Sequence, residues 1–531
     1  MQSRGMRALL VACASLVACV NLDAREFDQA IADAGGGLDA GVRTDVMGLQ
    51  PARCGDGRVT PGEACDDGNE RIDDGCQACQ VTAGYRCMGA PSSCSDINEC
   101  QSGDPGANDC DVNATCTNSP GSFRCTCKEG YVGDGTSCAA ATVVSVAAGG
   151  AYSCVLLSDG GVRCWGSGFN PLGYGNQLTF GDDEVPAAAG HVPLGEAAQK
   201  LSVGAYQICA ILDRGRVRCW GSNLFPTLLG YGTTGGIGDD ETPESIGDLP
   251  LGPVVGTVTQ VAGSETETCI VLSTGVVRCW GFGFSGDLGT GNTSDVSTAA
   301  AASNVSLGVA ADQIAVGSSF VCALSDGNVR CWGNGQQGAL GYGTTDSWGD
   351  DEAPSGAGNV VVGGQVQQLS AFGGHVCALL ATGSVRCWGF GGNGRLGYGN
   401  TQNVGDDETP ATAGDVPVGG SVQQIAAGGS HTCALLTTGA VRCWGSGLSG
   451  QLGYGDSNDI GDDETPASVG DVPVGGPVRL IAAGREHTCA VLTSGGVRCW
   501  GAGSLGQLGN QSTDNIGDDE LPATLGDVTV L

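Results

Sequence analysis

Short apolar runs separated by glycine-rich turns recur through most of the chain, and no long stretch keeps the 3.6-residue apolar spacing of an amphipathic helix. Short strands with turns between them predict an all-β fold. From residue 143 to 531 the pattern repeats in seven units of about 56 residues. The sequence therefore predicts a seven-bladed β-propeller over 143–531, preceded by two small disulfide-rich modules and a flexible tether.

The clearest unit reads HTCALLTTGAVRCWGSGLSGQLGYG, starting at His431. Its Cys-Ala-Leu strand, its Val-Arg-Cys-Trp-Gly return strand and the following Gln-Leu-Gly resemble the repeat of the regulator of chromosome condensation family. The resemblance implies a closed propeller, in a family that includes intracellular nucleotide-exchange factors and secreted protein-binding inhibitors. The last unit ends at Leu531 without a following first strand, whereas 143–149 is such a strand. We therefore expect the two ends to complete one blade together.

Each unit contains two cysteines, ten positions apart except in the fourth unit, where they are nine apart around Asp326-Gly327. A turn at the midpoint places the two cysteines opposite each other, with Cα atoms about 4.5 Å apart, within reach of a disulfide. Each staple closes a small loop, worth about 3 kcal/mol in the chain-entropy model. The predicted pairs are Cys154–Cys164, Cys209–Cys219, Cys269–Cys279, Cys322–Cys331, Cys377–Cys387, Cys433–Cys443 and Cys489–Cys499.

A Gly-Asp-Asp-Glu motif recurs in six units, at 181, 238, 349, 405, 461 and 517. We interpret it as a solvated acidic turn, which the arginine before each second cysteine could bind; a ring of cation sites is the alternative.

The histidines His375, His431 and His487 hold one place in their units, which Tyr152, Gln207, Glu267 and Phe320 hold elsewhere. This tolerance predicts a surface position. No convergent nucleophile, base and acid can be identified, so we expect binding rather than catalysis. A hydrolase or lyase acting at the propeller channel is the alternative.

Three departures from the repeat are candidates for a partner-binding patch, because loops on a rigid scaffold usually carry binding residues. They are residues 225–229 in the second unit, the stretch from Thr293 to Ala311 that replaces the acidic motif in the third, and Trp348 in the fourth; the candidate patch residues are Phe225, Leu228 and Trp348. Repeat drift without function is the alternative.

The chain begins with Arg4 and Arg7 before an apolar run over 8–18, the layout of a secretory signal in residues 1–19. The sequence Leu-Val-Ala-Cys ending at Cys19 resembles the lipobox of bacterial lipoproteins, which implies lipidation of Cys19. An ordinary cleaved signal is the alternative. Residues 20–53 are rich in Ala, Gly and Asp and predict a flexible tether with a reach of roughly 30 Å.

Residues 54–95 contain six cysteines and resemble a short cysteine-rich repeat common in myxobacterial surface proteins, through the segment CGDGRVTPGEACDDGNERIDDGCQAC. We expect a disulfide framework with undetermined pairing; half a zinc site at Cys76 and Cys79 is less favoured because no histidine is near. The six are Cys54, Cys65, Cys76, Cys79, Cys87 and Cys94.

Residues 96–138 resemble a calcium-binding EGF-like module, through Asp-Ile-Asn-Glu-Cys at 96–100, Cys-Thr-Asn at 116–118 and Gly-Tyr at 130–131. The resemblance implies the pairs Cys100–Cys116, Cys110–Cys125 and Cys127–Cys138. It also implies Ca²⁺ as a cofactor, which takes oxygen ligands; polar residues that merely cap turns are the alternative. The implied ligands are the side chains of Asp96, Glu99 and Asn118 and the backbone carbonyls of Ile97, Ser119 and Ser122.

Composition narrows the function further. There are 57 acids against 23 bases, a net charge of −34, which argues against nucleic acid as a partner. The 28 cysteines after a signal indicate an oxidising compartment. The sequence predicts a lipid-anchored binding protein of the outer membrane or cell surface, secreted if the lipobox is not used, with the lipid as its only membrane contact. Its partner would be a protein or a surface polysaccharide; a structural envelope protein is the alternative.

Overall fold

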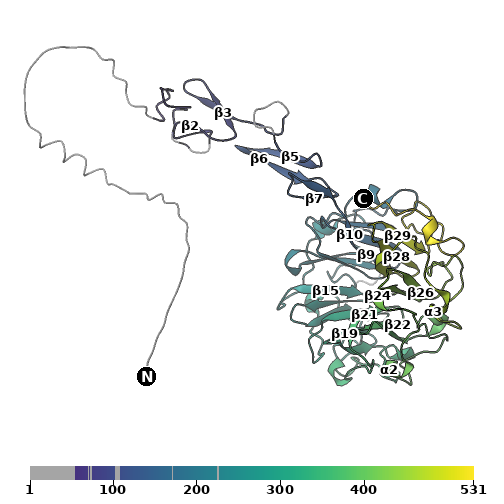
Figure 1. Cartoon of the computed structure of the whole chain (residues 1–531). Helices are drawn as coiled ribbons and strands as arrows, with labels where there is room; N and C mark the ends of the chain where they lie inside the picture. The colour runs from purple at the N-terminus through teal and green to yellow at the C-terminus, as the bar shows by residue number, and fades with distance from the viewer. Residues whose placement is uncertain (1–53, 70, 72–73, 102–107, 170, 224–226) are drawn as a thin grey trace, which may run out of the picture. The chain divides into compact units, whose positions relative to one another are not determined.

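The computed structural model describes residues 54–531 apart from 70, 72–73, 102–107, 170 and 224–226 (Figure 1). The predicted signal region, tether and lipidation site Cys19 lie outside the described residues. The chain divides into two compact units, Met1–Ile97 and Asn98–Leu531. No helix in the described ranges is long and apolar enough to span a bilayer.

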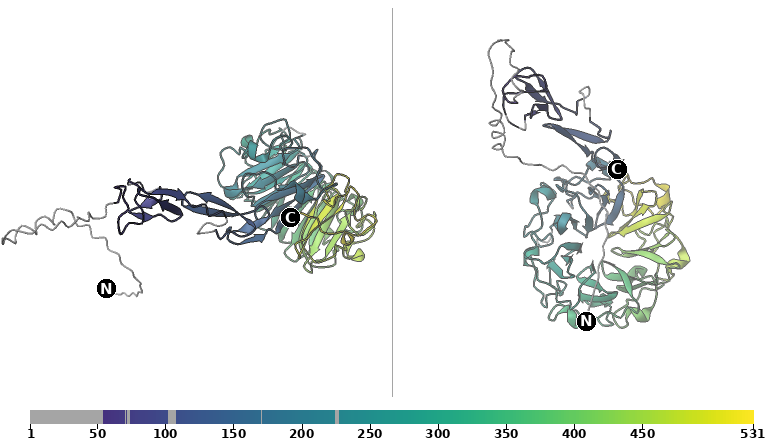
Figure 2. Two further views of the ribbon diagram at one scale, coloured as in Figure 1. Left: turned by 90° about the horizontal axis from the view of Figure 1, so that it is seen from above. Right: turned by 60° about the vertical axis from the view of Figure 1, so that its left-hand side comes forward.

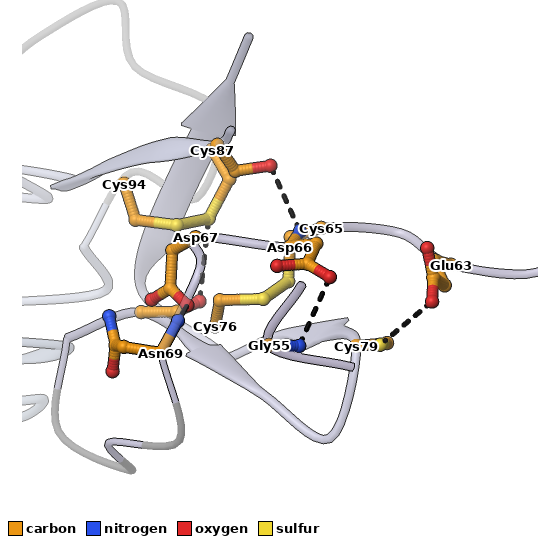
Figure 3. Close-up of a disulfide and its surroundings, with 12 residues drawn as sticks. Gly55, Glu63, Cys65, Asp66, Asp67, Asn69, Cys76, Cys79, Cys87 and Cys94 are labelled. Atoms are coloured by element: carbon orange, nitrogen blue, oxygen red, sulfur yellow. Dashed lines mark hydrogen bonds between the residues drawn. A yellow bond between two sulfur atoms is a disulfide. The ribbon is translucent and has the colours of Figure 1, made fainter. Parts of the chain in front are cut away.

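The first unit contains two small antiparallel hairpins, β1 (Cys76–Gln77) with β2 (Gln80–Val81) and β3 (Tyr85–Met88) with β4 (Ser93–Asp96). Disulfides join Cys65 to Cys76 and Cys87 to Cys94 (Figure 3). Cys54 and Cys79 are free thiols. The expectation that all six cysteines pair is therefore met for four of them.

Asp66 organises the loop that precedes these hairpins. Its side chain is buried, and its two carboxylate oxygens accept backbone amides from Gly55, Asp56, Gly57 and Gly68 at 2.9–3.1 Å (Figure 3). These four hydrogen bonds stabilise the charged form, and the pKa of Asp66 is lowered despite desolvation, which opposes the shift.

The second unit begins with the EGF-like module, formed by the hairpins β5 (Ala114–Ser119) with β6 (Ser122–Cys127) and β7 (Tyr131–Gly133) with β8 (Cys138–Ala140). Its three disulfides are Cys100–Cys116, Cys110–Cys125 and Cys127–Cys138. The pairing implied by the sequence resemblance is confirmed.

Seven three-stranded antiparallel sheets follow, arranged as a ring of blades (Figure 2, right). Blades 1 to 7 are, in chain order, β9 (Val143–Ala148), β10 (Tyr152–Leu157) and β11 (Val162–Gly166); β12 (Lys200–Val203), β13 (Gln207–Ile211) and β14 (Val217–Gly221); β15 (Val258–Gly263), β16 (Glu267–Leu272) and β17 (Val277–Gly281); β18 (Gln313–Gly317), β19 (Phe320–Ser325) and β20 (Asn328–Gly333); β21 (Val366–Phe372), β22 (His375–Leu380) and β23 (Val385–Gly389); β24 (Val422–Ala427), β25 (His431–Leu436) and β26 (Val441–Gly445); and β27 (Val478–Ala483), β28 (His487–Leu492) and β29 (Val497–Gly501). The predicted seven-bladed, all-β architecture is confirmed.

A fourth, outer strand in each blade is reduced to a single bridge on the glycine of the Cys-Trp-Gly triplet, as between Gly389 and Val404. Short helical turns lie outside it, among them α1 (Pro243–Ile246), α2 (Pro410–Ala413) and α3 (Pro466–Val469).

The two cysteines of every blade face each other in the register of the second and third strands and form the predicted disulfides. Their Cα atoms are 4.1 Å apart in blade 6 and 4.0 Å apart in blade 4. In blade 4 the shorter turn places Asp326 and Gly327 at φ of 47° and 74°, as a two-residue type I′ turn requires.

The ring closes differently from the sequence expectation. Strand β9 pairs with β10 in blade 1, and each sheet is built from consecutive strands, so the two ends do not complete one blade together. Instead, the C-terminal segment contacts blade 1 through hydrogen bonds: Arg163 Nη1 donates to the carbonyl of Val530, and Ala187 N to that of Thr529. That expectation was wrong because β9 completes the sheet of its own unit with β10 and β11, and the C-terminal segment only packs beside it.

Candidate functional site

The position held by histidine in three blades lies at a seam, the contact between one blade and the next. Its residues are 0–2% exposed in all seven blades, so the surface position predicted from their variability was wrong. His375 Nε2 lies 2.8 Å from Thr432 Oγ1 of the next blade, and His431 Nε2 lies 2.9 Å from Thr488 Oγ1. His487 Nε2 closes the ring at 2.9 Å from Ser153 Oγ of blade 1.

These contacts fix the histidine tautomer. Thr432 Oγ1 donates its single proton to the carbonyl of Arg395 at 3.0 Å, so it accepts a hydrogen bond from His375 Nε2–H. Burial lowers the pKa of His375 well below its usual value, that of His431 to about 3 and that of His487 to about 4. The three imidazoles are therefore neutral structural donors rather than catalytic bases.

The tryptophans of the triplets complete the seams. Trp444 Nε1 donates to the same Arg395 carbonyl at 2.9 Å, and Trp500 Nε1 to that of Gln451 at 3.0 Å. In the channel, glutamine side chains link neighbouring first strands: Gln424 accepts from Ile481 N and donates to Ile481 O at 2.8–3.0 Å. Such paired bonds make the ring a rigid scaffold.

The seam between blades 3 and 4 departs from this arrangement. Glu267 and Asp287 are both 0% exposed. Burial is the main cause of the raised pKa of both carboxyls, and it raises the pKa of Asp287 to about 7. Repulsion from Asp287 raises the pKa of Glu267 further. Val321 of blade 4 stands where Thr432 and Thr488 stand at the other seams.

The loops between first and second strands carry unrepeated charged residues at one end of the channel. Arg485 Nη1 of blade 7 lies 3.2 Å from Glu265 Oε1 of blade 3 and 3.5 Å from the Tyr206 hydroxyl of blade 2. Blades 7 and 3 are not neighbours in the ring, so Arg485 crosses the channel mouth. Sequence reasoning found no such cluster because the three residues come from different units.

Exposed apolar side chains lie at the same end. Glu267 at the start of β16 pairs with Gly281 at the end of β17. The loop before β16 and the loop after β17 therefore lie at the same end of the blade. Where the structure describes it, the third residue after the Cys-Trp-Gly triplet is exposed and apolar in three blades: Phe169 at 86%, Phe284 at 59% and Leu448 at 77%. We call these three, with Tyr206, Glu265 and Arg485, the channel-mouth face.

The patch predicted from repeat departures does not form in the described residues. Phe225 lies outside them. Leu228 is fully buried, and its carbonyl accepts Trp280 Nε1 at 3.1 Å and Thr268 Oγ1 at 2.9 Å. Trp348 is partly buried, packs on the core and forms the outer bridge of blade 4 with Gly333. Leu228 and Trp348 therefore have structural roles: the Leu228 carbonyl keeps its place at the seam, and Trp348 keeps its place in the outer bridge, although the surrounding sequence departs from the repeat.

The acidic motifs do not bind the arginines that precede the second cysteines. Arg386, for example, pairs with Asp415 at 2.8 Å and donates to the Val362 carbonyl at 2.5 Å. Within a motif, Glu184 Oε1 accepts Gly181 N at 3.1 Å, and the pKa of Glu184 is raised to about 6 by burial and by the neighbouring acids.

Four of the six implied calcium ligands lie in the second unit. Glu99 is 6% exposed, and its Oε2 has no hydrogen-bond partner among the described residues. Asn118, Ser119 and Ser122 lie on the hairpin β5–β6, where Ser119 Oγ donates to the Ser122 carbonyl at 2.9 Å. A buried carboxylate oxygen without a donor fits a cation site. Asp96 and Ile97 belong to the first unit.

The EGF-like module contacts blade 1 through a joint that has no counterpart in the other blades. Glu129 Oε1 accepts His191 N at 2.9 Å and lies 3.5 Å from Arg163 Nη2. Asp159 Oδ2 accepts Gly130 N at 3.2 Å. Blades 2, 5, 6 and 7 have their own aspartate in place of His191, as in the Arg442–Asp471 pair.

Comparison with known proteins agrees with this architecture. The regulator of chromosome condensation (RCC1) repeat matches residues 143–170, 311–339, 422–451 and 478–507, a second form of that repeat matches 382–435 and 438–491, and an EGF domain matches 100–138. The chain thus contains RCC1 repeats and an EGF-like domain, and its ring of seven blades is consistent with an RCC1-type propeller.

Two curated relatives illustrate the similarity. The Ultraviolet-B receptor UVR8 of Arabidopsis thaliana is 34% identical over 221 residues, 40% of this chain and 47% of UVR8. The E3 ubiquitin-protein ligase HERC2 of Homo sapiens is 29% identical over 265 residues, 48% of this chain and 5% of HERC2. The chain thus spans about half of UVR8 and a small part of HERC2.

Two solved structures share the fold. Human WBSCR16 has a TM-score of 0.53 at 22% identity, covering 66% of this chain and 86% of its own. Yeast RCC1 (Prp20), solved bound to Kap60, has a TM-score of 0.55 at 20% identity, covering 68% and 83%.

Proposed function

We propose that this chain is an extracytoplasmic binding protein whose propeller presents the channel-mouth face to a protein partner. The observation that carries the proposal is the cluster of Arg485, Glu265 and Tyr206, which joins blades that are not neighbours and interrupts the repeat where loops are exposed. Exposed Phe169, Phe284 and Leu448 add apolar area at the same end. Exposed aromatic and arginine side chains are typical of protein-binding hot spots.

The proposed setting comes from the sequence. The signal region and Cys19 support a lipid anchor in the outer membrane or at the cell surface, and Ca²⁺ bound by the EGF-like module would stiffen the segment that carries the propeller. Calcium would supply only charge and coordination there; Glu99 and Asn118 would hold it with their side-chain oxygens. The net charge of −34 favours a partner with a basic surface.

Binding is favoured over catalysis by burial. Glu267, Asp287 and the three seam histidines, whose pKa values are strongly shifted, are all 0% exposed, so a substrate in the channel cannot reach them. A structural envelope protein needs no unrepeated face, which makes it the weaker candidate.

Affinity capture tests the proposal. Immobilised wild-type protein and the variant Arg485→Glu/Phe284→Ser would be exposed to surface proteins of the source cells, with calcium or with a chelator. Val255→Ser is the matched control, because Val255 is 79% exposed and precedes β15, whose start pairs with Leu272 at the opposite end of the blade. We expect a protein enriched by wild type and control to fall at least tenfold with the variant. Equal recovery by all three proteins would refute the proposed face.

A further inference from the structure

The seams of the ring follow a pairing rule that one seam breaks. His375, His431 and His487 each meet a hydroxyl of the next blade, and Gln207 Nε2 donates to Thr268 Oγ1 at 3.2 Å. The Tyr152 hydroxyl donates to the carbonyls of Gly204 and Gln207. Phe320 is apolar, and so is Val376, which holds in the next blade the position that Thr432 holds in blade 6. Glu267 differs from both kinds of seam: its counterpart Val321 offers no polar side chain, and its carboxylate, unlike the Tyr152 hydroxyl opposite Ile208, has no proton to donate to backbone carbonyls when ionised.

The carboxylates at this seam lack donors. Glu267 Oε2 accepts the Thr266 hydroxyl at 2.5 Å, but Glu267 Oε1 and both oxygens of Asp287 have no hydrogen-bond partner among the described residues. The backbone amides of Asp287, Leu288 and Ser285 lie near the Asp287 carboxylate and oppose the rise in its pKa, but none has hydrogen-bond geometry to either oxygen. No Lys, Arg or His of the described chain forms an ion pair with either residue. Three buried carboxylate oxygens are thus left without a partner.

The two residues lie at one seam of the ring. Glu267 begins β16 and occupies the position from which the histidines reach the next blade. Asp287 lies at the same seam, because its carbonyl accepts Trp332 Nε1 of blade 4 at 2.9 Å, and Trp332 pairs with Val321. The equivalent position in blade 6 is Gln451, whose carbonyl accepts Thr488 and Trp500 in the same way.

We propose that the seam between blades 3 and 4 holds one divalent cation, ligated by the carboxylates of Glu267 and Asp287. Two buried carboxylates without a basic partner are stable when a cation neutralises them, and an all-oxygen donor set selects a hard ion such as Ca²⁺ or Mg²⁺. This cation takes the place of the histidine–hydroxyl bond found at three other seams and joins the two blades by electrostatic attraction. The inference is independent of the proposed partner-binding face and of the EGF-like module.

The best test variant copies another seam of the same protein. Glu267→His/Val321→Thr/Asp287→Gln gives the seam between blades 3 and 4 the residues His431, Thr488 and Gln451 of the seam between blades 6 and 7. The copied seam supplies its own hydrogen bonds, so this variant is expected to fold. Asp350→Asn/Asp351→Asn is the control, because these acids lie in an acidic motif beside Trp348.

The probe is Tb³⁺, added to full-length protein freed of metal and excited in the tryptophan band. Trp332 lies at the proposed site, whereas residues 96–138 contain no tryptophan, so the EGF-like module gives no sensitised emission. We expect sensitised emission from wild type and the control, competed away by Ca²⁺, and at least a tenfold loss in the seam-copy variant. Near-ultraviolet circular dichroism would check that the variant is folded.

Three results would overturn the proposal: no emission from wild type, equal emission from the folded seam-copy variant, or loss of emission in the Asp350→Asn/Asp351→Asn control. A shared proton between the two carboxyls is the physical alternative. It predicts that wild-type stability falls as pH rises from about 4 to about 7, equally with Ca²⁺ and with chelator, because the pKa of Asp287 is raised from its ordinary 3.8 to about 7 in the folded protein.

Discussion

At the scale of single residues, the seam histidines show how a titratable group serves as an uncharged connector. His431 donates from Nε2 to Thr488, and its Nδ1 is buried without a hydrogen-bond partner among the described residues. Protonation would place a charge in this enclosed site, facing Arg395 and His487, which also lower its pKa. The unfolded chain has no such restriction, so acid favours unfolding.

The double variant His431→Phe/Thr488→Val, which copies the Phe320 and Val376 pair of blades 4 and 5, tests this. The pKa of His431 is about 3 when folded against 6.5 ordinarily, so the unfolded state binds an extra proton between these values. Stability of the wild type is therefore lost as pH falls below about 6.5, by about 1.4 kcal/mol per pH unit for this histidine.

Denaturant unfolding without reductant, at neutral pH and at pH of about 5, gives the measurement. On going from neutral pH to pH of about 5, we expect the free energy of unfolding of the wild type to fall by about 2 kcal/mol more than that of the variant. Parallel losses in the two proteins would contradict the buried neutral histidine. Carboxyls with raised pKa act in the opposite direction, but they are common to both proteins and cancel in the difference.

At the scale of elements, the repeat pattern was sufficient to predict the strands, the facing cysteines and the ring of seven blades, because these depend on order within one unit. It could not predict the seams, which join residues one unit apart. His375, Tyr152 and Phe320 looked interchangeable and hence exposed, whereas each is buried where its blade meets the next one. Leu228 likewise lies where the sequence departs from the repeat, but its backbone carbonyl still accepts the hydrogen bond from Trp280 Nε1 at the seam.

The EGF-like module gives the prediction for a single element. If Glu99 Oε2 holds Ca²⁺, then Glu99→Ala should weaken calcium binding at least tenfold, because it removes a buried charged ligand. Asp134→Asn is the control: Asp134 is an acid of the same module, but its Oδ1 is already bonded to Thr136 and Ser137. Calorimetry on the full chain would measure both. Equal affinities for the two variants would remove Glu99 from the site.

At the scale of the whole second unit, the joint between the EGF-like module and blade 1 determines how the propeller is held. Arg163 lacks the aspartate that partners Arg218 in blade 2, because His191 stands in its place, and Glu129 of the module supplies the carboxylate instead. The propeller arginine thus completes its ion pair only when the module is docked. A module tied in this way moves with the propeller instead of swinging freely.

Replacing Glu129 should free the joint without unfolding either part. In Glu129→Ala, Arg163 and the amide of His191 lose a partner, and only the bond from Gly130 N to Asp159 remains of the three contacts described. We expect hydrogen exchange at residues 128–142 to quicken several-fold while the thermal midpoint changes little, since the Glu129 carboxylate is half-exposed and Arg163 keeps its bond to the Val530 carbonyl. Asp248→Ala is the matched control, because it removes the equivalent partner from Arg218 inside blade 2. Unchanged exchange at 128–142 in Glu129→Ala, or the same increase in the control, would show that Glu129 does not hold the module.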